Sequence, residues 1–252
     1  MSISLDEAVE LTRTGDVWVF RGRSVPDRAI QFTTNSPVNH VGMAVVLDDM
    51  PPLMWHAELG RSLPDLWSGT HQRGVQLHDL RDAVCVWANR YGQRAWLRQL
   101  DPPADGEMER AVLRTIARLD GTPFPSTAQL AWRWVRGRVP KLALPLPGRP
   151  APRRNPATPA TPATNASPAG SPGERDRAIP ASPIGSAGER DRALETAYCA
   201  EVVAVTYEAM GLLPAGRRPN WYDPGRFWSG DDLGLTADAR LGSEIEVRVP
   251  PR

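Results

Sequence analysis

Three residues carry the reactive side chains from which a function can be argued: Cys199, His40 and His56. Cys199 lies near the start of an apolar stretch with helical spacing, residues 197–210, which ends at Gly211. A cysteine in the first turn of a helix faces unpaired backbone N–H groups and the positive end of the helix dipole, which lower the pKa of a thiol and favour the nucleophilic thiolate. A small buried side chain at a helix start fits the same spacing, so a partner base has to be identified as well.

Thiol catalysis requires a base that takes the thiol proton and returns it to the leaving group, and a third polar group that fixes the tautomer of that base. Two neighbouring strands are predicted at residues 40–46 and 53–58, with a bend of Asp and Pro residues between them. His40 begins the first strand, next to small residues on the same face. His56 and Glu58 share one face of the second strand, because side chains alternate with a period of two.

The remaining elements are predicted from periodicity, capping residues and turns. A capping box at Ser4 starts a helix that Gly15 closes, and a strand buried on both faces follows. The predicted helices are 4–15, 25–33, Gly106–Leu119 and Phe124–Arg136, and the predicted further strands are 16–20, 75–77, 84–88 and 244–249. In this arrangement Cys85 is an inert thiol buried in a strand, and His71 and His78 are surface residues.

A change in composition marks an insertion. Of the 26 prolines, 12 fall between Pro140 and Pro183, and the hexapeptide Gly-Glu-Arg-Asp-Arg-Ala occurs twice, at Gly173 and at Gly188. A segment this poor in large apolar residues cannot offset its ordering entropy by burial. Residues 137–193 are therefore predicted to be a disordered Pro/Ala-rich insertion, and residues 1–136 and 194–252 are predicted to form one domain.

Charge and cysteine content exclude several classes of protein. The net charge of +1 over 252 residues provides no basic surface for nucleic acid, and no glycine-rich phosphate loop is present. The two cysteines make no disulfide framework and lack zinc-site spacing, so we expect neither a metal nor a cofactor. Without a run of 18 apolar residues or a basic and apolar leader, the expected location is the cytoplasm.

Three sequence blocks resemble those of the circularly permuted papain-like amidases, and more narrowly the YiiX-like branch of the NlpC-type cysteine hydrolases. The blocks are Gly15-Asp16-Val17-Trp18-Val19-Phe20-Arg21-Gly22, Ser36-Pro37-Val38-Asn39-His40-Val41-Gly42-Met43-Ala44 and Tyr198-Cys199-Ala200-Glu201-Val202-Val203. The segment Trp221-Tyr222-Asp223-Pro224 resembles a Tyr-x-Pro stretch of the same group. The resemblance implies an α+β fold in which a small antiparallel sheet packs against helices, with the histidine preceding the cysteine in the chain.

The resemblance also implies roles for individual residues. Cys199 becomes the nucleophile and His40 the general base, while His56 or, failing that, Glu58 supplies the third polar group. The backbone amide of Cys199 is the expected oxyanion donor. Ala200 stands where relatives usually have Ser, and Glu201 matches a family glutamate that we interpret as structural.

These roles predict a cysteine hydrolase that acts through a thioester acyl-enzyme on an amide or an ester. Peptide or peptidoglycan amides are the usual substrates of NlpC relatives, and lipid acyl groups are those of the related lecithin retinol acyltransferases; both classes remain open. Trp132 and Trp134 beside Arg136 are compatible with peripheral membrane contact, although a core helix explains them as well. The alternative is a non-catalytic binding module whose proline-rich insertion docks a partner.

Overall fold

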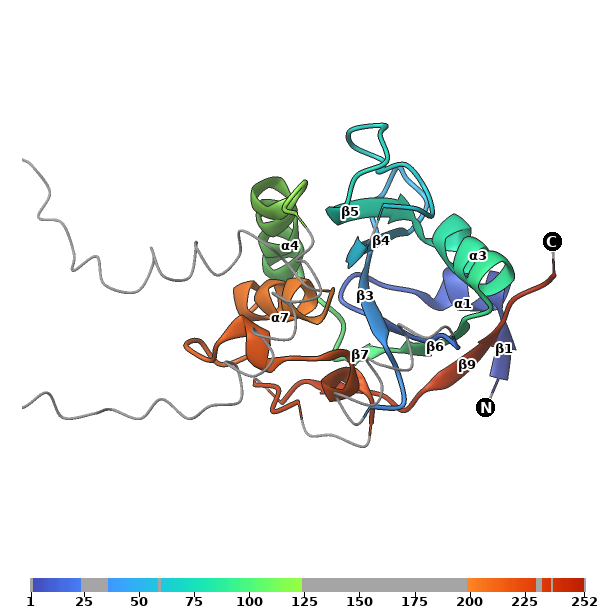
Figure 1. Cartoon of the computed structure of the whole chain (residues 1–252). Coiled ribbons are helices and arrows are strands. Elements are labelled where there is room, and N and C mark those ends of the chain that lie inside the picture. The colour runs from blue at the N-terminus through green and yellow to red at the C-terminus, as the bar shows by residue number, and fades with distance from the viewer. Residues whose placement is uncertain are drawn as a thin grey trace, which may run out of the picture.

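The computed structural model describes residues 2–23, 36–58, 60–123, 199–229, 233–236 and 238–251, which form an α+β fold (Figure 1). Its helices are α1 (Leu5–Leu11), α3 (Leu80–Tyr91), α4 (Gly106–Leu119) and α7 (Cys199–Ala209), with two short 3-10 helices, η1 (Pro219–Trp221) and η2 (Pro224–Phe227). The expected helices at 25–33 and 124–136 and the expected insertion at 137–193 lie outside the described residues.

A seven-stranded sheet forms the centre of the described part, in the order β1-β9-β6-β2-β3-β4-β5. Its strands are β1 (Ser2–Ser4), β2 (Val17–Arg21), β3 (His40–Val45), β4 (Leu53–Glu58), β5 (Gly74–Asp79), β6 (Arg94–Arg98) and β9 (Ile245–Arg248). Only the β1–β9 pair is parallel. A separate pair joins β7 (Leu100–Asp101) to β8 (Arg240–Leu241).

Helices cover both faces of the sheet. Figure 1 shows α1 and α3 on one side and α4 and α7 on the other. The central strand β2 is buried on both faces, as its continuous apolar sequence predicts. Its Trp18 and Phe20 join the core beneath α1 and α3, whereas Val17 and Val19 join the core beneath α4 and α7. Each face of the sheet therefore has its own hydrophobic core.

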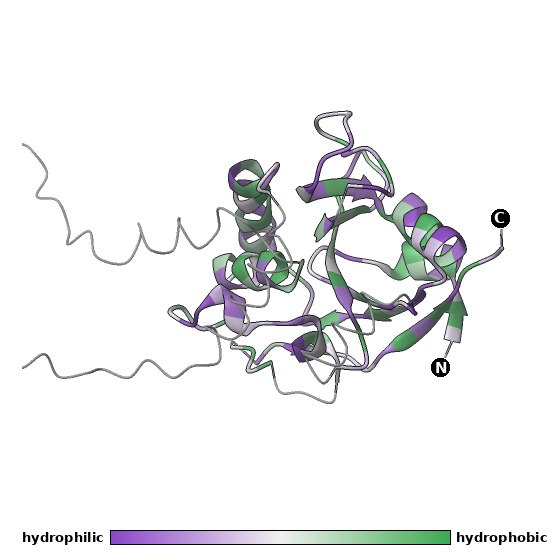
Figure 2. Ribbon diagram, in the orientation of Figure 1, coloured by the Kyte–Doolittle hydropathy of each residue, from purple (hydrophilic) through white to green (hydrophobic). Residues whose placement is uncertain are grey.

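Two predicted helices are confirmed, α4 with both boundaries and α1 with its start, although α1 ends at Leu11 and not at Gly15. Ser4 caps α1, its hydroxyl accepting a hydrogen bond from the backbone N–H of Glu7. Helix α4 begins after Asp105, whose carboxylate accepts two backbone N–H groups, and it covers the predicted residues. Figure 2 shows both hydrophilic and hydrophobic residues around α4, in agreement with its amphipathic sequence.

The strand predicted at residues 84–88 is wrong, because this segment lies inside helix α3. A short apolar run is compatible with a buried strand and with a buried helix. In this segment the capping residues at both ends favour the helix. The Asp79 side chain accepts the backbone N–H of Asp82 at the start, and Gly92 ends the helix with a left-handed φ of 64°. Cys85 is buried as expected, but on a helix. Among the described strands, the sequence pattern missed β6 and the short strands β1, β7 and β8.

The aromatic segment after α7 closes the core. Phe227 and Tyr222 are buried, and the Asp223 side chain caps η2 by accepting the backbone N–H of Gly225. The guanidinium groups of Arg217 and Arg226 lie over the Trp221 ring, 4.2 and 3.9 Å from its centroid. Because Phe227 and Tyr222 are buried, this aromatic segment caps the core.

Candidate functional site

Cys199 is the first residue of α7, as the sequence predicts, and is only 1% exposed. Every residue of α7 from Cys199 to Tyr207 is buried, which is the pattern of a helix enclosed on all sides. The helix packs against β3, β4, α4 and η1. The sequence thus forms a core helix whose N-terminal end carries the thiol.

The thiol of Cys199 lies among backbone N–H groups at the sheet. The pairing of β3 with β4 runs from Met43 to Val45 and stops there, and the backbone N–H of Val41 beyond that point acts on the Cys199 thiol in the direction that lowers its pKa. Burial raises the pKa of Cys199 to about 12, although the N–H groups of Val41, Ala200 and Cys199 itself lower it. The low pKa expected for the Cys199 thiol is therefore wrong, because loss of hydration on burial raises the pKa more than the N–H groups at the helix start lower it.

Buried hydrogen bonds fix α7 against the sheet. The indole Nε1–H of Trp55 on β4 donates to the Thr206 hydroxyl at 3.1 Å, and that hydroxyl donates to the carbonyl of Val202 at 2.7 Å. The Tyr207 hydroxyl donates to the carbonyl of Gly15 at 2.5 Å. These bonds satisfy polar groups in the core and specify how α7 sits on the strands.

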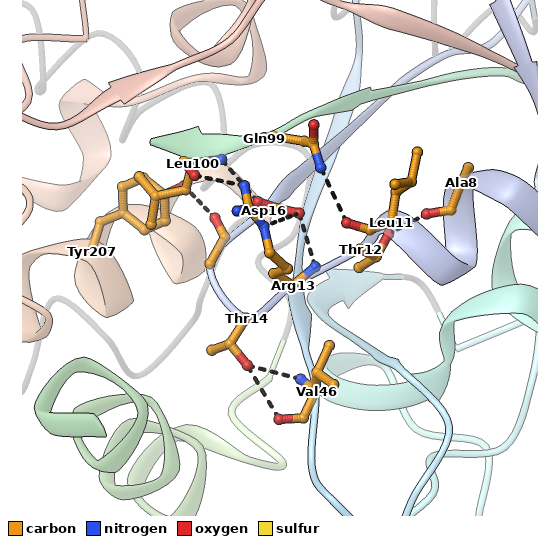
Figure 3. Close-up of polar contacts among 11 residues, drawn as sticks. Ala8, Leu11, Thr12, Arg13, Thr14, Asp16, Val46, Gln99, Leu100 and Tyr207 are labelled. Carbon is orange, nitrogen blue, oxygen red and sulfur yellow. Dashed lines mark hydrogen bonds and ion pairs between the residues drawn. The ribbon is translucent and has the colours of Figure 1, made fainter. Parts of the chain in front are cut away.

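Asp16 organises the turn that receives Tyr207 (Figure 3). Its two carboxylate oxygens accept the backbone N–H groups of Leu100 and Arg13, each at 2.8 Å. Burial raises the pKa of Asp16 to about 6 in spite of these bonds. The carboxylate therefore joins the start of β2 to β7 at the site where the Tyr207 hydroxyl reaches Gly15.

Three histidines on neighbouring strands form a hydrogen-bonded row. Nε2 of His40 on β3 lies 3.2 Å from Nδ1 of His56 on β4, and Nε2 of His56 lies 3.1 Å from Nδ1 of His78 on β5. The rings of His40 and His56 pack edge-on against Trp87 of α3. The predicted pairing of His40 with His56 is thus present in the structure, and His78 extends it.

The surface position predicted for His78 is wrong, because the residue is 1% exposed. The signal that could have placed it was the alternation of β5, where Gln76 and His78 share a face across from His56 and Met54. His71 is exposed, as predicted.

All three histidines of the row are held neutral. Burial lowers the pKa of His40 to about 3 and that of His78 to about 4, and it lowers the pKa of His56 well below its ordinary value. A charge on one of these rings also disfavours a charge on the next. At neutral pH each ring therefore carries one proton and can donate through one nitrogen and accept through the other.

The His40 ring and the Cys199 thiol lie against different cores. His40 contacts Phe20 and Trp87 on the α3 side, whereas Cys199 belongs to the core on the α7 side. Among the described residues no hydrogen bond joins the two groups. The link between them is β3, because His40 begins this strand and the helix that starts at Cys199 packs against it.

Glu58, the alternative third group, turns toward the loop that follows β4. Its carboxylate accepts the backbone N–H of Ser62 at 3.4 Å, and burial raises its pKa. His56 is therefore the group that contacts His40.

Neither a metal cluster nor a membrane-spanning helix is found in the part of the chain that the structure describes. No group of three or more His, Cys, Asp and Glu residues there has the geometry to hold a metal ion. No helix there is long and apolar enough to cross a membrane. The Trp132 and Trp134 stretch lies outside this part.

Comparisons with known proteins give one weak likeness that we report. No protein-family model matches the sequence, and no curated protein matches it. The structure is similar to the crystal structure of the metalloprotein YiiX from Escherichia coli O157:H7, with a TM-score of 0.36 and 21% identity. The match covers 49% of this chain and 56% of YiiX, so the chain spans little more than half of that protein's length. At this TM-score the likeness carries no argument about function.

Proposed function

We propose that this chain is a cysteine hydrolase of the permuted papain-like, NlpC-type class, with Cys199 as nucleophile and His40 as general base. One observation carries the proposal: Cys199 stands at the N-terminus of α7, and this helix packs on β3, the strand that begins with His40. The pairing of His40 with His56 supports it, because a base in a thiol enzyme needs a polar partner that fixes its tautomer.

The proposed reaction has two steps. The Cys199 proton passes to His40, and the sulfur attacks the carbonyl carbon of an amide or ester; the leaving amine or alcohol then takes that proton, and a thioester remains. Water, deprotonated by His40, attacks the thioester, which releases the acid and restores the thiol. The N–H groups of Cys199 and Val41 near the sulfur are the candidate donors to the oxyanion.

The reaction requires a second arrangement of the site. In the closed structure the thiol is buried and protonated, and the His40 ring faces the other core. His40 is the first residue of β3 and is partly exposed, and its backbone is paired with that of Phe20 on β2. Substrate binding must bring the ring and the thiol together, since proton transfer needs contact between them.

The substrate is an amide or an ester, with peptide, peptidoglycan and lipid acyl groups as the classes to test. A liposome co-sedimentation assay separates the lipid class from the others, and absence of binding counts against it.

A binding module is the second candidate, and the burial of the Cys199 thiol favours it. A side chain that is 1% exposed with a raised pKa fits a structural cysteine, as free cysteines in cores usually are.

Turnover by three variants separates the two candidates. The full chain is assayed against activated esters and an amide library, together with Cys199→Ala, His40→Ala and the control Cys85→Ala, whose thiol is also buried. The hydrolase predicts that the first two variants lose turnover while keeping the fold, and that the control keeps it. Equal turnover in Cys199→Ala and the control contradicts the proposal.

A further inference from the structure

His78 is a buried residue that has no role in the proposed reaction. It lies at the end of the histidine row, and its Nε2 is buried without a hydrogen bond in the described structure. Burying an unsatisfied ring nitrogen costs about 1–3 kcal/mol, so a histidine at this position requires an explanation. An apolar side chain of similar size avoids that cost.

The row couples the protons of its three rings. Nε2 of His40 is engaged with His56, which leaves Nδ1 as the nitrogen of His40 that can act as a base. Nδ1 can accept a proton only if the neutral ring carries its hydrogen on Nε2. Nε2–H of His40 then donates to Nδ1 of His56, and Nε2–H of His56 donates to Nδ1 of His78. The hydrogen of His78 must consequently lie on its Nε2.

The surroundings of His78 favour a hydrogen at that position. The carboxylate of Asp65 and the carbonyl of Leu63 act on the His78 ring in the direction that favours its protonated form, although neither forms a hydrogen bond of normal geometry with Nε2. Asp65 is itself fixed, because its two oxygens accept the backbone N–H groups of Leu77 at 2.9 Å and Ser68 at 2.7 Å. A buried acceptor group thus stands at the far end of the row.

We propose that His78 is a positioning residue: through His56 it holds His40 in the tautomer whose Nδ1 is free to accept a proton. The geometry also provides a path for charge. When Nδ1 of His40 takes a proton, its Nε2–H can pass to Nδ1 of His56, and the Nε2–H of His56 can pass to Nδ1 of His78. The positive charge then resides on His78, near Asp65, and the opposite charge remains on the group that gave the proton. The role of His40 as a base rests on the proposed function, whereas the preference of His78 for a hydrogen on Nε2 rests on the Asp65 carboxylate and the Leu63 carbonyl beside its ring.

The tautomers are measured by NMR on the full chain labelled with ¹⁵N-histidine, without substrate. Long-range proton–nitrogen spectra at pH 7.5 show which nitrogen of each ring carries the hydrogen. The chain has only four histidines, and exposed His71 serves as an internal reference for a ring outside the row. We expect a hydrogen on Nε2 of His40, His56 and His78. A hydrogen on Nδ1 of His40 overturns the proposal.

Two variants test the dependence on His78. In His78→Phe the ring remains but the acceptor for His56 is lost, so the signals of His56 and His40 should shift toward the Nδ1–H tautomer. In His78→Asn the amide oxygen can replace Nδ1 as acceptor, and both rings should keep Nε2–H. Unchanged His40 and His56 tautomers in His78→Phe overturn the proposal. If that variant fails to fold, the spectra of the native chain and of His78→Asn still decide the matter, because either can show the wrong tautomer.

These spectra separate the inference from the proposed function. Correct tautomers in a chain that hydrolyses nothing refute the hydrolase and leave the coupling of the row intact. Turnover by a chain whose His40 carries its hydrogen on Nδ1 refutes the coupling of the row and leaves the hydrolase intact.

Discussion

Thr206→Val removes the hydroxyl that joins the cysteine helix to a histidine strand. Thr206 lies on α7 about two turns after Cys199, and it accepts the indole N–H of Trp55, which immediately precedes His56. Valine keeps the shape of the side chain but leaves that N–H unsatisfied in a fully buried position. The cost of such a group is about 1–3 kcal/mol. At about 2–4 °C per kcal/mol, the midpoint of thermal unfolding should fall by about 2–12 °C.

A double-mutant cycle isolates the bond from the change in packing. Trp55→Phe removes the N–H together with ring volume, and the Thr206 hydroxyl keeps its donor bond to Val202. In that background Thr206→Val should cost about 1–3 kcal/mol less than in the native chain, because no buried N–H is left without a partner. Urea unfolding of the four proteins provides the free energies. Equal costs of Thr206→Val in both backgrounds refute the claim that this bond holds α7 on β4.

Three further predictions concern ionisation. His78 has a pKa of about 4 in the native chain against 6.5 in the unfolded chain, so the unfolded chain binds this proton more tightly. The free energy of unfolding should therefore fall by about 3 kcal/mol from this residue alone as the pH drops from 6.5 toward 4. A free energy of unfolding, measured in urea, that does not change with pH over this range contradicts the neutral row. Asp16 acts in the opposite direction between pH 6 and 3.8, because its carboxyl binds a proton more tightly in the native chain than in the unfolded chain. Asp16→Asn should therefore increase the loss of unfolding free energy over this pH range by about 3 kcal/mol. With a pKa of about 12 instead of 9.0, native Cys199 has about a thousandfold less thiolate at neutral pH than an exposed cysteine. Iodoacetamide should therefore label Cys199 at least that much more slowly in the folded Cys85→Ala variant than in the same variant unfolded by urea.

Local patterns predict much of the site. Alternation identifies the strands that carry His40 and His56, and the apolar run with a glycine stop identifies α7 with Cys199 at its start. Gly211, with a left-handed φ of 78°, ends that helix region as expected. These features follow from residues close together in the chain, so a single sequence is sufficient for them.

The remaining features depend on contacts between distant segments. Alternation groups residues by face, but it does not determine which helix covers each face, and so the sequence does not predict that His40 meets Trp87 while Cys199 joins the opposite core. The same reasoning applies to His78, whose burial depends on how β5 pairs with β4. The raised pKa of Cys199 likewise reflects complete enclosure of α7, which the helix dipole alone does not indicate.

Formation of an acyl-enzyme on Cys199 is the central claim, and trapping it is the most direct test. The full chain is incubated with p-nitrophenyl acetate, quenched in acid, and analysed by intact mass and peptide mapping, with Cys199→Ala and Cys85→Ala treated in parallel. We predict one acetyl group on the peptide that contains Cys199, in the native chain and in Cys85→Ala, and none in Cys199→Ala. Absence of the adduct from Cys199 in the native chain, or an adduct that persists in Cys199→Ala, contradicts the assignment of Cys199 as the nucleophile.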